Sequence, residues 1–375
     1  MKKTIIYYHP RSMPKNVDRG SSVRVRAMYE AFESLDYHVI LLAGSLTERL
    51  GVMRSIKRRV SEGLLIDFVY IENTNAPICL AEGGVPCNSF RDYVFLAWLR
   101  SNNIPIGVFY RDVYWKFDFY SELLPWPLCY LTRPLCYLDW YMYDRFSDVF
   151  FLPSLLMNEY LPKPRGSGKV FELPPGFGAG YGKGEVRDAY AGQMLKLLYV
   201  GGVSPHVYDL SGMLSTILRI DGVKLTICCR EDEWRVDGAE YRLLMEGSDK
   251  IDVVHFQGDQ LAELYSQNDV FMMAVNYSEY RDFSMPIKFF EAIGYGLPIV
   301  SLYQKAIASL INEFKIGWVL ESEDELIELL SGMVCDRSEV SERSENVALA
   351  QSQFTWKTRA ATVPIYLNRN KVNVS

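Results

Sequence analysis

The chain has 375 residues, of which 49% are hydrophobic, so it can form two domains with sizeable cores and is not expected to be disordered. Its net charge of −6 argues against a general nucleic-acid binder. No apolar run approaches the roughly 20 residues that span a bilayer, and the start lacks a signal-peptide core. Seven scattered cysteines and four distant histidines predict reduced thiols and no metal site, and hence a cytoplasmic protein.

The first half alternates short apolar strands with helices. A strand at 4–8 is followed by a polar loop and a helix at 22–35, and further strands are expected at 39–43, 65–71, 104–110, 149–152 and 169–173. Short apolar strands separated by helices are typical of a parallel sheet with both faces covered.

The pattern restarts after a stretch at 176–191 that is rich in glycine and charge. Strands are expected at 195–200, 223–228, 253–256, 270–274 and 299–303, with a short helix at 261–267. We therefore expect two doubly wound α/β domains, at 1–180 and 190–350, and a helical tail at 351–375 that packs back on the first domain. Ligands of such sheets bind beyond the carboxyl ends of the strands, so the site is expected in a cleft between the domains.

Residues 283–298 carry the clearest sign of chemistry. Ser284 is the expected N-cap of a helix with Pro286 in its first turn. Lys288 and Glu291 share one helix face. The free N–H groups, the helix dipole and the lysine suit a diphosphate, and the glutamate suits ribose hydroxyls. The alternative is an ordinary amphipathic helix with a solvated Lys–Glu pair.

These motifs resemble the GT-B glycosyltransferases of the family 4-like group, which use nucleotide-diphosphate sugars. The resemblance covers nearly the whole chain and is strongest at 268–301, which includes Phe-Glu-Ala-Ile-Gly-Tyr-Gly-Leu-Pro-Ile-Val-Ser. Leu-Tyr-Val-Gly-Gly at 198–202 and Leu-Pro-Pro-Gly at 173–176 also resemble family elements. This resemblance to the family implies two Rossmann-like domains, a donor that is a UDP-sugar, and transfer without a metal or other cofactor.

The resemblance also implies roles for single residues. Glu291 aligns with the ribose-binding glutamate, Gly201 and Gly202 with a turn at the diphosphate, Arg230 with a phosphate-binding region, and Gln257 with the region that holds the base. Tyr280, Ser284, Met285 and Lys288 complete the expected donor set, and Tyr277, Glu279 and Arg281 are expected to shape the pocket.

The chain departs from the family at the position of an earlier glutamate, which is Phe283 here, flanked by Asp282. Met-Pro-Ile-Lys at 285–288 instead resembles bacterial exopolysaccharide glucuronosyltransferases, in which the lysine contacts the donor and the chemistry is inverting. Retaining and inverting chemistry both stay open, with retaining slightly favoured. Lys288 is the expected stabiliser of the leaving group, and Asp112 is the candidate catalytic base.

Further residues are expected on the acceptor side. Asp112 and Arg111 follow a strand and could hold hydroxyls in a retaining enzyme, although Asp112 could equally be a helix cap or an ion-pair partner. His9, Ser21 and Arg24 follow the first strand, where the family carries a glycine-bearing loop. A structural histidine and a solvated helix turn are the alternatives.

Two features point to a membrane. Residues 110–146 are rich in aromatic side chains, which favour a bilayer interface, and residues 49–59 hold a basic cluster that suits anionic lipid. The alternatives are a buried core or oligomer interface for the aromatic residues and a solvated face for the charges.

The expected function is transfer of a sugar to a glycan or a lipid-linked glycan in bacterial surface polysaccharide synthesis, at the inner face of the membrane, with no nucleic-acid partner. A sugar-nucleotide epimerase of GT-B fold and a non-catalytic GT-B partner subunit are the competing hypotheses.

Overall fold

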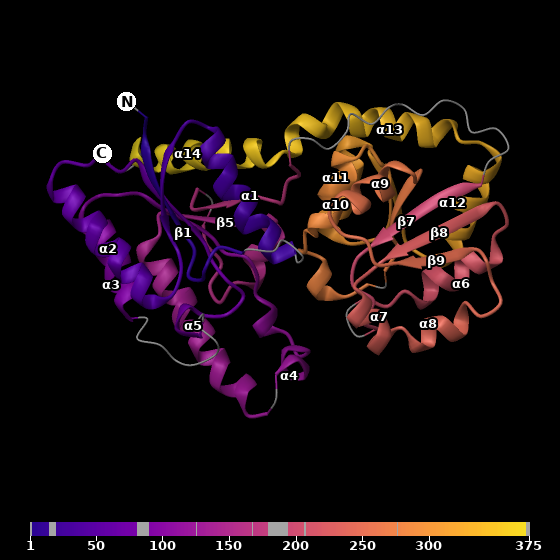
Figure 1. Ribbon diagram of the computed structural model, residues 1–375, viewed down its shortest axis with the longest axis horizontal. Coiled ribbons are helices and arrows are strands. Elements are labelled where there is room, and N and C mark those ends of the chain that lie inside the picture. Colours follow the sequence, from indigo (N-terminus) through magenta and orange to yellow (C-terminus); the bar gives the residue numbers. More distant parts are fainter. Residues whose placement is uncertain are drawn as a thin grey trace. The chain divides into compact units, whose positions relative to one another are not determined.

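The computed structural model describes residues 2–14, 20–80, 90–124, 126–166, 168–178, 194–205, 208–275 and 277–372. The chain forms two compact units (Figure 1). Unit 1 comprises Met1–Pro175 and Trp356–Ser375, and unit 2 comprises Gly176–Thr355.

Unit 1 is built on a parallel sheet. In the described residues its strands have the order β2-β1-β3-β4-β5-β6. Their bounds are β1 (Thr4–Tyr8), β2 (His38–Leu42), β3 (Phe68–Glu72), β4 (Ile106–Phe109), β5 (Val149–Leu152) and β6 (Val170–Glu172). Strands β1, β3, β4 and β5 are buried along their whole length, as expected for a sheet covered on both faces.

The helices of unit 1 cover the two faces of this sheet. They are α1 (Gly20–Ser34), α2 (Leu46–Ser61), η1 (Ile78–Leu80), α3 (Phe90–Ser101), η2 (Tyr114–Lys116), α4 (Tyr120–Leu123), α5 (Leu128–Phe146), η3 (Leu155–Tyr160) and α14 (Trp356–Val372). The connection through α1 runs one way across the sheet, and those through α2, α3 and α5 run the other way. Because such crossovers are right-handed, α2, α3 and α5 share one face, and α1 lies on the other with α14 against it (Figure 1).

A buried ion pair joins α2, α3 and β1. The Arg49 guanidinium meets both carboxylate oxygens of Asp92 at 3.0 and 3.1 Å, and neither side chain is exposed. Arg49 also donates to the carbonyls of Pro10 and Gly44, and the Tyr8 hydroxyl donates to Asp92 at 2.6 Å. These partners satisfy charges that would otherwise be costly to bury.

Unit 2 has a second parallel sheet, whose order in the described residues is β12-β11-β10-β7-β8-β9. The strands are β7 (Leu195–Val200), β8 (Val223–Cys228), β9 (Ile251–Val254), β10 (Val270–Met273), β11 (Ile299–Leu302) and β12 (Gly317–Leu320). The helices are α6 (Ser211–Arg219), α7 (Glu231–Asp237), α8 (Ala239–Leu244), α9 (Asp259–Ser266), η4 (Glu279–Arg281), α10 (Ile287–Gly294), α11 (Lys305–Phe314), α12 (Glu323–Cys335), α13 (Ser338–Ala350) and η5 (Gln351–Phe354). The doubly wound α/β class is confirmed for both units.

Two expected strand bounds were wrong. Strand β3 begins at Phe68 rather than at Leu65, whose side chain is 85% exposed. Strand β9 begins at Ile251, which pairs with Leu225, and ends before His255. Most of the expected boundary at 176–191 lies outside the described residues. Among the described helices, none has the length and apolarity to cross a bilayer.

Candidate functional site

The expected donor residues follow four neighbouring strands of unit 2. Gly201 and Gly202 follow β7, Arg230 follows β8, Gln257 follows β9, and the segment 277–286 follows β10. Because these strands are parallel, all four connections leave the same edge of the sheet. The edge therefore brings together most of the predicted donor set.

The turn after β7 is closely packed around its glycines. The Tyr199 hydroxyl donates to the Gly202 carbonyl at 2.6 Å. A Cβ at Gly202 would lie 2.6 Å from the Tyr208 ring and 2.8 Å from Glu233 Oε1, closer than atoms pack. The turn therefore admits no side chain at this position.

Glu233 organises this turn from the start of α7. Its Oε1 accepts the backbone N–H groups of Val203 and Ser204 at 2.8 and 3.2 Å, and its Oε2 accepts from the Arg230 guanidinium at 2.9 Å. Glu233 is not among the residues predicted from the sequence. The acidic run at 231–233 directly after a strand was the signal that could have found it.

Arg281 lies close to Tyr199 and Tyr208, the tyrosines beside this turn. Its guanidinium is 4.9 Å from the centre of the Tyr208 ring, and the side chain is largely buried. Burial lowers the pKa of Arg281, and the neighbouring tyrosines oppose this shift. Together with Arg230, it places two cationic side chains beside the glycine turn, which is an arrangement suited to phosphate.

Helix α10 contributes the Lys288–Glu291 pair. Lys288 Nζ donates to Glu291 Oε2 at 2.6 Å, and the Tyr265 hydroxyl donates to the same oxygen at 3.4 Å. Glu291 is 6% exposed, whereas about a third of the Lys288 side chain is exposed. Burial raises the pKa of the Cys228 thiol, and the positive charge of Lys288 opposes it, so the lysine lies close to the end of β8.

The expected N-cap of α10 was wrong. The cap residue is Pro286, and no side chain accepts a hydrogen bond there. Ser284 lies too early because the helix begins only at Ile287, and its N–H is bonded to the Arg281 carbonyl in the preceding turn. The first N–H groups of α10 therefore have no side-chain cap.

Phe283 stands where the family carries its earlier glutamate, and it makes an apolar contact. Phe283 is buried, and its ring packs edge-on against Tyr280 at 5.3 Å between centres. The neighbouring Asp282 is also buried, where it accepts from the Tyr277 hydroxyl at 3.0 Å and pairs with Lys305 at 2.9 Å. Asp282 thus fixes the start of α11, and Met285 is buried beside this segment.

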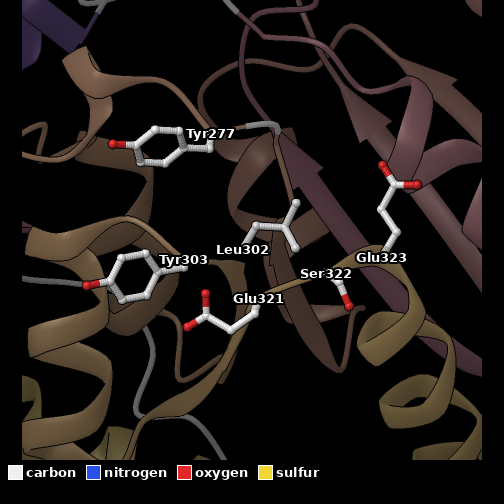
Figure 2. Close-up of a pocket in the computed structure, with 6 residues that line it drawn as sticks. All are labelled: Tyr277, Leu302, Tyr303, Glu321, Ser322 and Glu323. Carbon is white, nitrogen blue, oxygen red and sulfur yellow. The ribbon is translucent and has the colours of Figure 1, made fainter.

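A cavity of about 400 Å³ opens at the ends of β11 and β12 (Figure 2). It is lined by Tyr277, Leu302, Tyr303, Glu321, Ser322 and Glu323. The two tyrosine rings point the same way (Figure 2). The cavity lies at the same edge of the sheet as the donor residues, on the side of β11 and β12.

Unit 1 carries a buried charge network at the ends of β1, β3 and β4. Glu72 is fully buried and accepts from Arg24 at 3.1 Å, from Arg111 at 3.0 Å and from the Tyr70 hydroxyl at 2.7 Å. Arg24 is itself buried, 3.4 Å above the centre of the Phe109 ring. It also donates to the Leu173 carbonyl at 3.1 Å, so its guanidinium is enclosed within unit 1.

His9 belongs to the same network. Its Nδ1 donates to the Glu72 carbonyl at 2.9 Å, and burial lowers its pKa to about 4. It is therefore neutral at pH 7. Asp112 Oδ1 accepts the N–H groups of Val113 and Tyr114 at 2.7 and 3.0 Å, so it caps the turn η2. The side chain of Ser21 and the loop before it lie outside the described residues.

Residues 195–336 match the family described as "Glycosyl transferases group 1". No curated protein matches the chain in sequence. Solved structures do resemble it. Sucrose-phosphate synthase from Thermosynechococcus elongatus is 14% identical with a TM-score of 0.64, and each chain is covered completely. Anabaena Alr3699/HepE in complex with UDP and glucose is 10% identical over 98% of this chain and 100% of that one, with a TM-score of 0.60.

WaaG, a glycosyltransferase involved in lipopolysaccharide biosynthesis, is 14% identical over 96% of this chain and 98% of its own, with a TM-score of 0.57. These likenesses span the whole chain and show its fold, which is GT-B with two Rossmann-like domains.

Proposed function

We propose that the protein transfers a sugar from a UDP-sugar to a glycan or a lipid-linked glycan. The premise is that unit 2 carries a group 1 glycosyltransferase domain in an enzyme of GT-B fold. The observation that carries the proposal is the meeting of the glycine turn, Arg281 and the Lys288–Glu291 pair at one edge of the unit 2 sheet. The UDP in the structure of the similar HepE supports uridine as the base.

Each part of this edge fits one part of the donor. The Gly201–Gly202 turn lets backbone approach the diphosphate, and Lys288, Arg281 and the start of α10 offset its charge. The Glu291 carboxylate is suited to accept from ribose hydroxyls. Since a glycosyl transfer leaves a nucleoside diphosphate, these cations stabilise the leaving group without a metal ion.

For the stereochemistry we propose retention. An inverting enzyme needs a carboxylate that takes the acceptor proton. The candidate, Asp112, already accepts two backbone N–H groups in its own turn, an arrangement suited to holding hydroxyls. No carboxylate stands at position 283, so retention here would not use the family's earlier glutamate.

For the acceptor we propose a bacterial surface polysaccharide or its lipid-linked precursor, reached at the inner face of the membrane. Support comes from the fold shared with WaaG, which is involved in lipopolysaccharide biosynthesis. The buried Glu72 network would hold Arg111 in place beside Asp112 for contact with acceptor hydroxyls.

Calorimetric titration with UDP, GDP and UDP-sugars, in the presence of EDTA, tests the proposal. Micromolar binding of UDP that is lost in Glu291→Ala is the expected result. Binding without transfer, but with turnover of UDP-N-acetylglucosamine in the absence of acceptor, would favour an epimerase. Failure of every nucleotide to bind would favour a non-catalytic partner subunit. The anomeric configuration of the product, read by NMR, separates retention from inversion.

A further inference from the structure

Helix α5 presents an apolar face to solvent. Its inner face is buried through Cys136, Trp140 and Tyr143. The exposed large apolar side chains of α5 and its entry are Trp126, Leu128, Tyr130, Leu131, Tyr137, Leu138 and Tyr141. Trp126 is 79% exposed and Leu131 is 62% exposed. The spacing of residues 130, 134, 137 and 141 places them along one stripe of the helix.

The neighbouring helix α3 also carries exposed apolar side chains. Helix α3 packs against α5, and Lys57 of α2 lies 5.3 Å from the centre of the Trp98 ring of α3. Phe90 and Val94 of α3 are also largely exposed. Helices α2, α3 and α5 therefore form one layer, which covers a single face of the unit 1 sheet (Figure 1).

This layer is strongly basic although the whole chain is acidic. The lysines and arginines of the three helices that are not buried are Arg54, Lys57, Arg58, Arg59, Arg91, Arg100, Arg133 and Arg145. The only acidic side chains of these helices that are not buried are Glu48 and Asp144. Asp144 pairs with Arg165, and Glu48 caps the start of α2. Just beyond the helix ends, Glu62 pairs with Arg58 and Asp148 pairs with Arg100, so the layer keeps an excess of positive charge.

We propose that the outer surface of this layer, called the lipid face and defined by α2, α3 and α5, binds an anionic lipid bilayer. Tryptophan and tyrosine favour the depth of the headgroups, and exposed leucines can enter the acyl boundary beside them. Arginine and lysine bind the phosphates of anionic lipids. All residues of the lipid face belong to unit 1. The proposal rests on the proposed function only for its purpose, which is to bring the enzyme to a lipid-linked acceptor.

Other partners fit this surface less well. A symmetric dimer through the same face would set one basic layer against another, because a two-fold interface matches each patch with itself. A nucleic acid would pair with the cations but would leave the exposed apolar side chains of α5 in contact with water or phosphate. A bilayer matches both features at once.

Flotation of the full-length protein with phosphatidylcholine vesicles, with and without phosphatidylglycerol, tests the proposal. The protein should bind the anionic vesicles, and binding should fall as salt is raised. Because each basic residue near the surface is worth about 1 kcal/mol, the triple variant Arg54→Gln, Arg58→Gln, Arg59→Gln should partition about 100-fold less. A pair of exposed arginines in unit 2, Arg219→Gln with Arg235→Gln, is the charge control.

The exposed apolar side chains of α5 have their own test. Leu131→Glu with Tyr141→Glu should lower partitioning at least about tenfold, since the inserted side chains are lost and negative charge is added. Leu349→Glu with Leu243→Glu alters leucines of unit 2 that are at least as exposed, and it should leave partitioning to vesicles unchanged. Unchanged melting by circular dichroism shows that each variant is folded.

Three outcomes would overturn the proposal. The wild-type protein could fail to bind anionic vesicles, or the control variants could lose as much binding as the lipid-face variants. The third is a protein that does not bind vesicles but forms a dimer in solution, which the α5 substitutions convert to a monomer. UDP titration of the same variants keeps the two proposals apart. Vesicle binding without UDP binding would remove the proposed function and leave the lipid face standing.

Discussion

Replacing Lys288 by methionine should weaken UDP binding by about tenfold. A hydrogen bond to a charged group contributes about 1.5–3 kcal/mol, and Lys288 supplies one such contact to the diphosphate. The lower end of this range applies because the lysine already donates to Glu291 at 2.6 Å, so a phosphate must share or replace that partner.

The same substitution carries a cost in stability that must be separated from binding. Glu291 is 6% exposed, and without the lysine its carboxylate keeps the Tyr265 hydroxyl at 3.4 Å as its partner. The loss should lower the free energy of unfolding by about 1–3 kcal/mol. Adding Glu291→Gln removes the buried charge, so the double variant should regain stability without regaining affinity for UDP.

The assay is calorimetric titration of each variant with UDP, UMP and uridine. Because Lys288 is assigned to the diphosphate, its loss should leave uridine binding unchanged, reduce UMP binding slightly and reduce UDP binding most. An equal loss for all three ligands would show that the variant damages the fold of the site. No loss for any ligand would show that the diphosphate lies elsewhere.

Other expectations follow from named contacts. Gly202→Ala should weaken UDP binding at least about tenfold, because its Cβ would meet Tyr208 and Glu233; unchanged affinity in the same titration would contradict this. Arg49→Met should cost about 3–5 kcal/mol in urea unfolding, since Asp92 stays buried and charged; a loss below about 1 kcal/mol would refute the pairing argument. Burial raises the pKa of Asp139 to about 7, so the folded state keeps a proton that the unfolded state releases near pH 4. Stability from this group is full at acid pH and is lost as pH rises through about 7; Asp139→Asn should flatten that slope in unfolding curves, and an unchanged slope would contradict it.

Much of the fold could be predicted because its strands are continuous apolar runs between turns. The bounds of β5, β7 and β8 are those expected from the sequence. Strand β12 was missed because Gly-Trp-Val-Leu begins with a glycine and its two middle side chains are only half-buried, so it does not form a fully apolar run. Its glycine is needed because a Cβ at Gly317 would clash with the Ile299 carbonyl, which sequence patterns do not reveal.

The candidate site was predictable only where its chemistry is local. Lys288 and Glu291 are three residues apart on one helix, so their pairing could be anticipated. Arg24 and Glu72 are 48 residues apart, and His9 and Glu72 are 63 apart. Their burial depends on how strands and helices pack, and the same holds for the approach of Arg281 to Tyr208.

Unit 1 is assembled from two separate stretches of chain, because α14 follows unit 2 in sequence but packs against α1. During synthesis, unit 2 is complete as a continuous stretch before the ribosome has made the last element of unit 1. Until the final residues emerge, unit 1 therefore lacks the cover that α14 gives to α1, β3 and β4. An expression fragment cut at the end of unit 2 would keep all of unit 2 and yet lack the last helix of unit 1.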